Sequence, residues 1–314
     1  MPEKEWPRIA VVGAGAVGCY FGGMLARAGA PVTLIGRAQH VEAINREGLF
    51  IDSIHFKEHV SVSASTELAA ARDAQLVLFA VKTVDTESTA KLLAPYLAPD
   101  TNVVSLQNGV DNAERIDFAA GIMAISAVVY IAVEMSGAGH VKYSGRGDLV
   151  IGNSLPNQGA SESELTEIAE TFTRAGVPCQ VSQNITLELW KKLIMNCAYN
   201  ALSALSRARY GRLVADAGSV EVMKQVVAEG VAVGKASGVD LPAGNLLAAV
   251  LQLGRVVPEA LSSTAQDIAR GKPTEIDSLN GFLVRRGAEV GVPTPVNQTL
   301  YSLVKLLERT PLSK

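Results

Sequence analysis

Hydrophobic and polar positions change their spacing part-way along the chain. Up to about residue 181, short apolar runs typical of buried strands alternate with helical segments; the runs are residues 9–12, 31–35, 76–80, 103–106, 122–133, 141–143, 149–151 and 177–181. From Thr186 onward such runs stop, and long segments of helical periodicity are separated by breaks that contain Gly and Pro. The pattern predicts an α/β domain with a doubly wound sheet over residues 1–183 and an all-helical domain over 184–314.

One helical segment, residues 189–205, has polar side chains where apolar ones are expected. Lys192, Asn196 and Asn200 are spaced four apart and therefore share one helix face. An apolar row lies beside them and consists of Leu189, Leu193, Cys197 and Ala201. A lysine that borders a buried face loses solvation, which lowers its pKa and suits it to proton donation. The plainer alternative is an amphipathic helix whose Lys192 extends to solvent.

A glycine-rich loop follows the first predicted strand and opens a helical segment. It reads Gly13, Ala14, Gly15, Ala16, Val17 and Gly18. In a dinucleotide-binding loop of this form the first glycine makes a tight turn, the second lets the backbone approach a pyrophosphate, and the third permits close packing of helix on strand. Because the loop lies between a strand and a helix near the start of the chain, it predicts a dinucleotide site.

The end of the second predicted strand bears on the choice of dinucleotide. A site for NAD normally has Asp or Glu about 20 residues after the loop, where it binds the ribose hydroxyls. Here Gly36 and Arg37 occupy that region. A guanidinium pairs with a phosphate through two hydrogen bonds, so Arg37 favours NADP, although a surface arginine is the alternative.

Further polar residues follow other predicted elements. Lys82 and Asn108 each come two residues after a predicted strand, 76–80 and 103–106, at the sheet edge where ligands of doubly wound folds bind. Asn108-Gly109 is also a common turn, and Lys82 could be a solvated charge. Late in the chain, Thr274 is predicted to cap a helix with Asp277 at the reciprocal position, which leaves Glu275 in the first turn.

The composition favours a two-domain protein and argues against several kinds of binding site. A chain of 314 residues with 48% hydrophobic content supports two cores, and a net charge of −3 argues against nucleic acid as a partner. The three cysteines are far apart in apolar surroundings, so we expect neither a disulfide nor a metal site. His55 and His59 lie in an alternating segment and are predicted to be exposed sheet residues. The early apolar stretch fits neither a signal peptide nor a membrane span, which favours a cytoplasmic protein.

The chain resembles the ketopantoate reductases over almost its whole length. The motifs that carry the resemblance are the Gly13–Gly18 loop, Gln107-Asn108-Gly109, residues 189–200, Ser262-Ser263 and residues 274–281. The resemblance implies a Rossmann domain followed by a helical domain of the 6-phosphogluconate dehydrogenase C-terminal type. It also implies NADPH and a 2-keto acid bound between them, and reduction of 2-dehydropantoate to (R)-pantoate in pantothenate and coenzyme A biosynthesis.

The resemblance also implies roles for individual residues. Lys192 matches the general acid of the family and Glu275 its essential carboxylate. Substrate-binding groups match Asn108, Asn196, Asn200 and Ser263, while NADPH contacts match the Gly13–Gly18 loop, Arg37, Lys82 and Asn108. Glu275 could bind a substrate hydroxyl or keep Lys192 protonated.

Several alternatives remain open from the sequence. A β-hydroxyacid dehydrogenase or a reductase of another 2-keto acid would share Lys192 and Asn196, and Arg207 and Arg209 would favour a larger or doubly anionic substrate if they faced it. A redox sensor that binds NADP without catalysis is a more distant alternative. The apolar helices of the second half could pack within one chain or between two, so a homodimer is also an open alternative.

Overall fold

The computed structural model describes residues 5–155 and 159–310, and these residues form two compact units. The first unit comprises residues 1–107 and 111–185, and the second comprises residues 108–110 and 186–314, apart from those not described. Each unit has its own buried core. The expected sequence of an α/β part followed by a helical part is confirmed.

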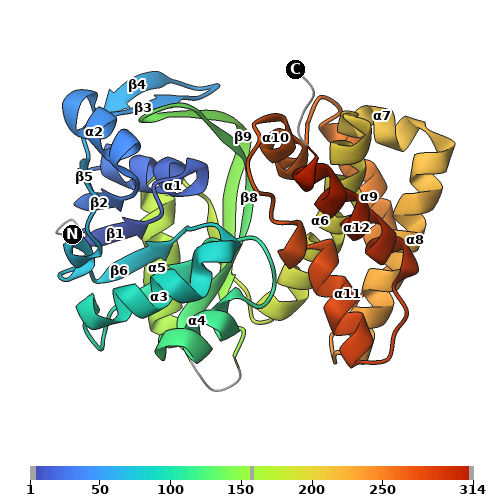
Figure 1. Ribbon diagram of the computed structural model, residues 1–314. Helices are drawn as coiled ribbons and strands as arrows, with labels where there is room; N and C mark the ends of the chain where they lie inside the picture. Colours follow the sequence, from blue (N-terminus) through green and yellow to red (C-terminus); the bar gives the residue numbers. More distant parts are fainter. Residues whose placement is uncertain (1–4, 156–158, 311–314) are drawn as a thin grey trace. The chain divides into compact units, whose positions relative to one another are not determined.

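A single twisted sheet organises the first unit (Figure 1). Its strands are β1 (Ile9–Val12), β2 (Val32–Ile35), β3 (Leu49–Asp52), β4 (Lys57–Val60), β5 (Ser63–Ser65), β6 (Leu76–Phe79), β7 (Asn102–Ser105), β8 (Ala124–Gly137), β9 (His140–Gly152) and β10 (Cys179–Val181). The order is β4-β3-β9-β8-β7-β6-β1-β2-β5, with β10 beside β9. The run from β8 to β5 is parallel, which explains its nearly continuous apolar strands.

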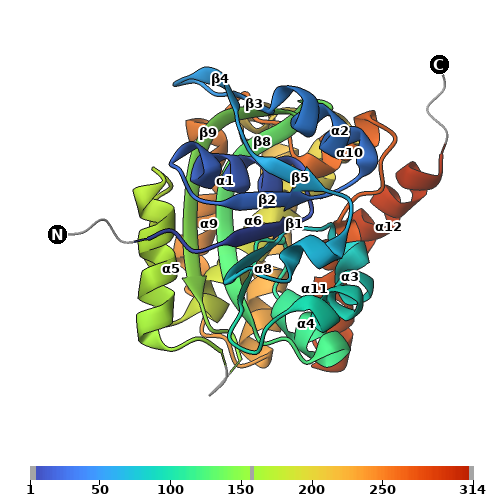
Figure 2. The same cartoon turned by 90° about the vertical axis from the view of Figure 1, so that its left-hand side faces the viewer.

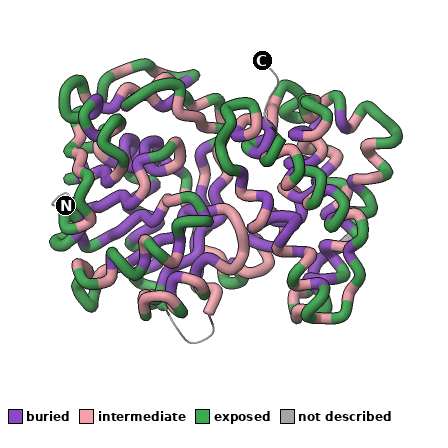
Figure 3. Tube along the Cα trace, in the orientation of Figure 1, coloured by how far each residue is buried: buried purple, intermediate pink, exposed green. Residues whose placement is uncertain are grey.

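Helices cover both faces of this sheet, as the doubly wound prediction requires (Figure 2). Side chains alternate along β1, so Ile9 and Val11 enter one core while Ala10 and Val12 enter another. The first core is completed by α1 (Ala16–Arg27) and α5 (Glu162–Arg174), and the second by α3 (Thr86–Leu93) and α4 (Asn112–Ala120). Figure 3 shows the central strands as the most buried part of the unit.

The predicted strands 141–143 and 149–151 are one strand in the structure, β9. Between them Gly145 and Arg146 both have positive φ, at 131° and 52°. They form an irregularity in the pairing with β8 that interrupts the alternation of apolar positions. The Arg146 guanidinium lies 4.2 Å from the ring centroid of Tyr130 and 3.0 Å from a carboxylate oxygen of Asp148. Through these contacts the Arg146 side chain is held against its neighbours in β8 and β9.

The histidine segment is only partly a strand. His59 lies in β4 and is exposed, as predicted, whereas His55 lies in a turn before β4. The turn forms because the Ser53 hydroxyl accepts hydrogen bonds from the backbone N–H groups of His55 and Phe56.

The second unit is built from helices around one apolar core. They are α6 (Ile185–Ser206), α7 (Tyr210–Ala215), α8 (Ala217–Ala236), α9 (Ala243–Val256), α10 (Ser263–Ala269), α11 (Asn280–Glu289) and α12 (Pro295–Arg309). Two glycines of α8 allow close packing against α6, because a Cβ on Gly230 would lie 2.8 Å from Ile194 and one on Gly234 3.2 Å from Trp190. Helix α6 is thereby fixed in the middle of the unit's core.

Candidate functional site

The glycine loop has the backbone geometry of a dinucleotide-binding turn. Gly13 has φ of 109°, and a Cβ there would lie 2.6 Å from the carbonyl carbon of Ala80. A Cβ on Gly18 would lie 2.2 Å from the carbonyl oxygen of Gly13. A Cβ on Gly15, by contrast, would meet no atom of the described residues within 4 Å. Gly13 and Gly18 therefore permit the packing of the loop, while Gly15 faces open space.

Helix α1 begins directly in this loop. Gly15 is its N-cap, no side chain caps it, and its first turn, from Ala16 to Gly18, contains no acidic residue. The first amide N–H groups of a helix have no partner within the helix, and the helix dipole favours an anion at this end. The backbone at Gly15 therefore fits the pyrophosphate of a dinucleotide.

Two basic side chains start from backbone segments that touch the glycine loop. Gly36 lies against Ala14, since a Cβ there would be 2.6 Å from that of Ala14, and Arg37 follows as the N-cap of α2 (Ala38–Glu47). Lys82 follows Ala80, whose backbone lies against Gly13. Both Arg37 and Lys82 are exposed. The structure thus brings the predicted cofactor residues of the first unit together around one loop.

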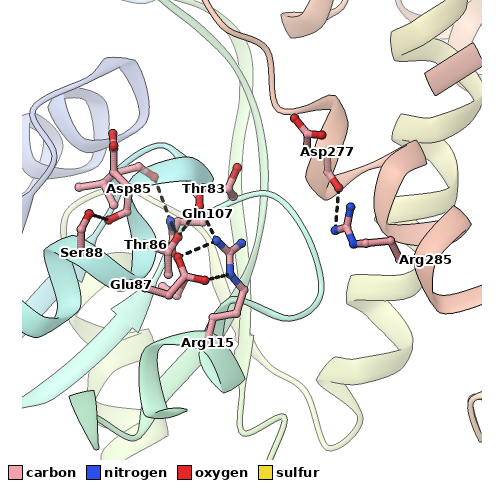
Figure 4. A network of polar contacts seen from close by, with 11 residues as sticks. Thr83, Asp85, Thr86, Glu87, Ser88, Gln107, Arg115, Asp277 and Arg285 are labelled. Atoms are coloured by element: carbon pink, nitrogen blue, oxygen red, sulfur yellow. Dashed lines mark hydrogen bonds and ion pairs between the residues drawn. The ribbon is translucent and has the colours of Figure 1, made fainter. Parts of the chain in front are cut away.

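A polar network holds the segments after β6 and β7 in place (Figure 4). The Gln107 amide nitrogen donates to the carbonyl oxygen of Val81 at 3.1 Å and to the Thr86 hydroxyl at 2.8 Å. Arg115 donates to the carbonyl oxygen of Thr83 at 2.7 Å and to both carboxylate oxygens of Glu87, at 2.7 and 2.9 Å. The hydrogen bond from Arg115 lowers the pKa of Glu87, so this pair is charged at neutral pH.

Sequence reasoning did not identify this network. Gln107 was recognised only as part of a motif, and Arg115 lies on a helix face with no periodic signal of its function. The available signal was the position of Thr83 and Thr86, a few residues after a predicted strand and beside the predicted ligand residue Lys82. The structure shows that both threonines are buried.

The second unit brings together three predicted site residues that are distant in sequence. Lys192 Nζ donates to Asn108 Oδ1 at 3.0 Å, and Asn108 Nδ2 donates to Glu275 Oε2 at 3.1 Å. Asn108 belongs to this unit although it lies only three residues after β7 ends, and Val110 packs against the helical core. Lys192 and Glu275 are both half-buried. The Asn108 amide thus joins the candidate proton donor to the candidate carboxylate.

The remaining substrate candidates lie on α6 and at the start of α10. Asn196 is half-buried and Asn200 is buried, both in α6 beyond Lys192, and Ser263 is exposed in the first turn of α10. The buried Ser262 hydroxyl accepts from the N–H of Ala265 at 3.0 Å and donates to the carbonyl oxygen of Asn200 at 3.2 Å. Ser262 therefore caps α10 and attaches it to α6, a role that sequence reasoning did not assign.

The predicted capping box at Thr274 and Asp277 is wrong. Only a short 3-10 turn, Ile276–Ser278, forms there, with Glu275 as its N-cap. The Thr274 hydroxyl donates to Glu308 at 2.6 Å, and Asp277 accepts from Tyr301 at 2.6 Å and from Lys305 at 2.8 Å. Side chains of α12 therefore replace the local partners that the sequence suggested, and Arg285 also donates to the Asp277 carbonyl oxygen (Figure 4).

Three other basic residues lie on α6 or just after it, and none has an assigned role in the site. Lys191 pairs with Glu188 at 2.9 Å. Arg207 is exposed and has φ of 57° just after α6 ends. Arg209 is exposed too and lies 3.6 Å from a Glu259 carboxylate oxygen.

The cysteines lie in apolar surroundings in the first and second units. Cys19 and Cys197 are buried, and Cys179 is half-buried with its pKa raised to about 12 by desolvation. Within residues 5–155 and 159–310, no group of three or more His, Cys, Asp or Glu side chains could hold a metal ion. Among the described helices, none combines the length and apolar character needed to cross a bilayer.

Models of one protein family match residues in both units. The family model "Ketopantoate reductase PanE/ApbA" matches residues 9–155, and the model of the same family's C-terminal part matches residues 184–308. The chain belongs to the ketopantoate reductase family. Members of the ketopantoate reductase family are nicotinamide-dependent oxidoreductases with a Rossmann-type first domain and a helical second domain, which confirms the predicted fold class.

Individual relatives cover almost the full length. A 2-dehydropantoate 2-reductase of Pyrococcus horikoshii is 35% identical over 303 residues, which are 96% of this chain and 97% of the relative. The crystal structure of a PanE/ApbA family ketopantoate reductase from Ralstonia eutropha JMP134 is 49% identical with a TM-score of 0.89, over 96% of this chain and 98% of that one. D-mandelate dehydrogenase, solved with NADH and anilino(oxo)acetate, is 25% identical with the same TM-score and coverage.

Proposed function

We propose that this chain is a cytoplasmic enzyme that reduces 2-dehydropantoate to (R)-pantoate with NADPH, a step of pantothenate and coenzyme A biosynthesis. The observation that carries the proposal is the Lys192–Asn108–Glu275 arrangement, with its two hydrogen bonds of 3.0 and 3.1 Å. Residues 1–183 would bind the cofactor and 184–314 the substrate. The near full-length similarity to 2-dehydropantoate 2-reductases supports the choice of substrate.

In this proposal the side chains of the protein donate the proton to the substrate and hold the reacting groups in position. When bound, NADPH supplies the hydride for the keto carbon. Lys192 donates a proton to the carbonyl oxygen and neutralises the charge that develops there. Asn108 holds the Lys192 ammonium in place through its amide oxygen. Asn196, Asn200 and Ser263 would bind the substrate's polar groups.

Glu275 has two roles in this proposal that are compatible with the geometry. Its carboxylate accepts a hydrogen bond from Asn108, which itself accepts one from Lys192, so its negative charge favours the protonated lysine through the amide. The same carboxylate can accept a hydrogen bond from a substrate hydroxyl.

Absorbance of NADPH tests the proposed reaction directly. We expect rapid oxidation with 2-dehydropantoate and slower oxidation with other 2-keto acids. The likeness to D-mandelate dehydrogenase makes an aryl 2-keto acid the alternative substrate, and faster turnover of phenylglyoxylate would favour it. Tight binding of NADPH without oxidation by any 2-keto acid would instead support a sensor.

Glu275→Gln is predicted to lower kcat/KM for 2-dehydropantoate by about 100-fold, because the amide has no charge to support Lys192. Since Glu275 is half-buried and the substitution preserves its size, the free energy of unfolding should change by about 1 kcal/mol or less. Steady-state kinetics and urea denaturation check both values. Glu221→Gln, on the exposed surface of α8, is the matched control. Full activity in Glu275→Gln, or its unfolding, would contradict the assigned role.

Arg37→Ala is predicted to weaken NADPH binding by about 10- to 100-fold and to leave NADH binding nearly unchanged, because only NADPH carries the 2′-phosphate that charge-assisted hydrogen bonds would hold. Fluorescence titration of both cofactors measures the ratio. Arg46→Ala removes an exposed arginine from α2, the helix that Arg37 precedes as N-cap, and should change neither affinity. An equal loss of affinity for both cofactors would show that Arg37 does not recognise the phosphate.

A further inference from the structure

Glu275 lies in a part of the second unit that regular secondary structure does not hold. It precedes the 3-10 turn Ile276–Ser278, in the connection between α10 and α11. The residues before it, Gly271, Lys272 and Pro273, are exposed. A carboxylate in such a segment needs contacts from elsewhere if it is to have one fixed position.

One face of α12 supplies these contacts on both sides of Glu275. Tyr301, Lys305 and Glu308 follow the i, i+4, i+7 spacing of a single helix face. We call these three residues the α12 clamp. Glu308 Oε1 accepts from the N–H of Thr274 at 2.8 Å and from its hydroxyl at 2.6 Å, immediately before Glu275. Tyr301 and Lys305 donate to the two carboxylate oxygens of Asp277, two residues after it.

Lys305 joins the two sides of the clamp. Its ammonium lies 2.8 Å from Asp277 Oδ2 and 2.9 Å from Glu308 Oε2. The Glu308 side chain is only 13% exposed and that of Lys305 26%, so solvent screens these contacts less than it screens surface ion pairs. The network is continuous from Thr274 through Glu308, Lys305 and Asp277 to Tyr301.

The titration of these groups agrees with a charged network at neutral pH. Burial alone would raise the pKa of Asp277, but hydrogen bonds from Lys305 and Tyr301 bring it below its usual value. Burial also opposes ionisation of Glu308, whose pKa is nevertheless lowered by Thr274 and Lys305. The two carboxylates raise the pKa of Lys305 against the effect of its own burial.

A glycine of the late sequence motif permits the close approach of α12. A Cβ on Gly281, in the first turn of α11, would lie 2.9 Å from the Tyr301 ring. The absence of a side chain there lets the ring lie against α11 while its hydroxyl reaches Asp277. The motif that contains Glu275 therefore also contains the space for the clamp.

We infer that the α12 clamp positions the Glu275 carboxylate for catalysis, with Lys305 as the central positioning residue. The inference rests on the proposed function, because Glu275 is the group through which the clamp acts. Lys305 itself touches neither Glu275 nor Lys192 in any contact described above. Its effect on the reaction is therefore indirect and passes through the backbone of residues 274–277.

A double-mutant cycle with Lys305→Met and Glu275→Gln tests the inference. We expect Lys305→Met alone to lower kcat/KM for 2-dehydropantoate by about 10- to 100-fold, since small misplacement of a catalytic group has effects of that size, with NADPH affinity unchanged. In the Glu275→Gln background the same change should lower kcat/KM less than about twofold, because interacting residues are not additive. Lys305→Arg should restore most of the activity.

Hydrogen exchange supplies a readout that is independent of turnover. Lys305→Met should increase amide exchange in residues 272–280, where the Thr274 N–H donates directly to the clamp. Lys224→Met, which removes a lysine that pairs with Glu221 on α8, should change neither exchange there nor activity. If Lys305→Met fails to fold, Tyr301→Phe removes only the hydroxyl contact with Asp277 and should show the same pattern more weakly.

Two results would overturn the inference. An equal loss of kcat/KM with and without the Glu275→Gln change would show a general structural effect, and unchanged exchange in residues 272–280 would show that the segment is held by other contacts. An unaltered protein that turns over no 2-keto acid would refute the proposed function instead, and the exchange measurement would then decide by itself whether the clamp holds this segment.

Discussion

Lys192→Ala is expected to lower kcat for 2-dehydropantoate by about 100- to 10,000-fold, the range that general acid catalysis typically contributes. The substitution removes the only side-chain proton donor that the proposed mechanism assigns to the carbonyl oxygen. It also removes the hydrogen bond from Lys192 to Asn108 Oδ1, one of the contacts that orient the amide. NADPH affinity, measured by fluorescence titration, should remain within about twofold, since the substitution replaces none of the predicted NADPH contacts.

The neighbouring lysine is the matched control. Lys191 is on the same helix and pairs with Glu188, so Lys191→Ala removes the same charge without touching Asn108. Its kcat should stay within about twofold of the unaltered protein, because neither Lys191 nor Glu188 has an assigned role in the reaction. Equal losses in the two variants would remove the case for Lys192 as the proton donor.

Gly18→Ala is expected to lower the free energy of unfolding by about 3 kcal/mol, more than any other substitution proposed here. This value is at the upper end of what overpacking usually costs. A Cβ at Gly18 would lie 2.2 Å from the carbonyl oxygen of Gly13 and 2.9 Å from the Val11 side chain. Backbone atoms cannot rotate away as a flexible side chain would, so α1 would have to shift from β1. Urea denaturation followed by circular dichroism measures the change.

Gly15→Ala separates the folding role of the loop from its binding role. A Cβ at Gly15 meets no described atom within 4 Å, and the φ of −89° suits alanine. The variant should therefore lose only about 1 kcal/mol as a poorer N-cap. Its NADPH affinity should nevertheless fall about tenfold or more, because the methyl group occupies the space where a pyrophosphate would approach the amides. Similar loss of stability in the Gly15 and Gly18 variants would contradict this division.

Helices and strands could be predicted from the sequence where the spacing of apolar and polar residues along a short segment determines them. The strand runs at 9–12 and 76–80 are β1 and β6 within one residue, because buried parallel strands need continuous apolar sequence. The face of α6 that carries Lys192, Asn196 and Asn200 followed from the four-residue spacing alone. The glycine loop was predictable because the spacing of its glycines is a local pattern, and a Cβ on Gly13 or Gly18 would meet backbone atoms.

Contacts between distant residues could not be predicted in the same way. Lys192 and Asn108 are 84 residues apart, and Asn108 and Glu275 are 167 apart, so no local periodicity connects them. The sequence suggested that Thr274 and Asp277 would bond to each other, whereas Glu308 and Lys305 of α12 compete successfully for them. These partners become available only when α12 packs beside the segment.

The assignment of residues 108–110 to the helical unit limits how the protein can be divided. A fragment that begins at Thr186 would contain Lys192 and Glu275 but not the amide that hydrogen-bonds to both. The same holds for a chimaera in which the second half is exchanged at this boundary, because Asn108 and Val110 would then come from a different parent. Recombination at residue 185 therefore has to carry the segment after β7 with it, and exchange of the two halves as independent modules would separate a single site between two parents.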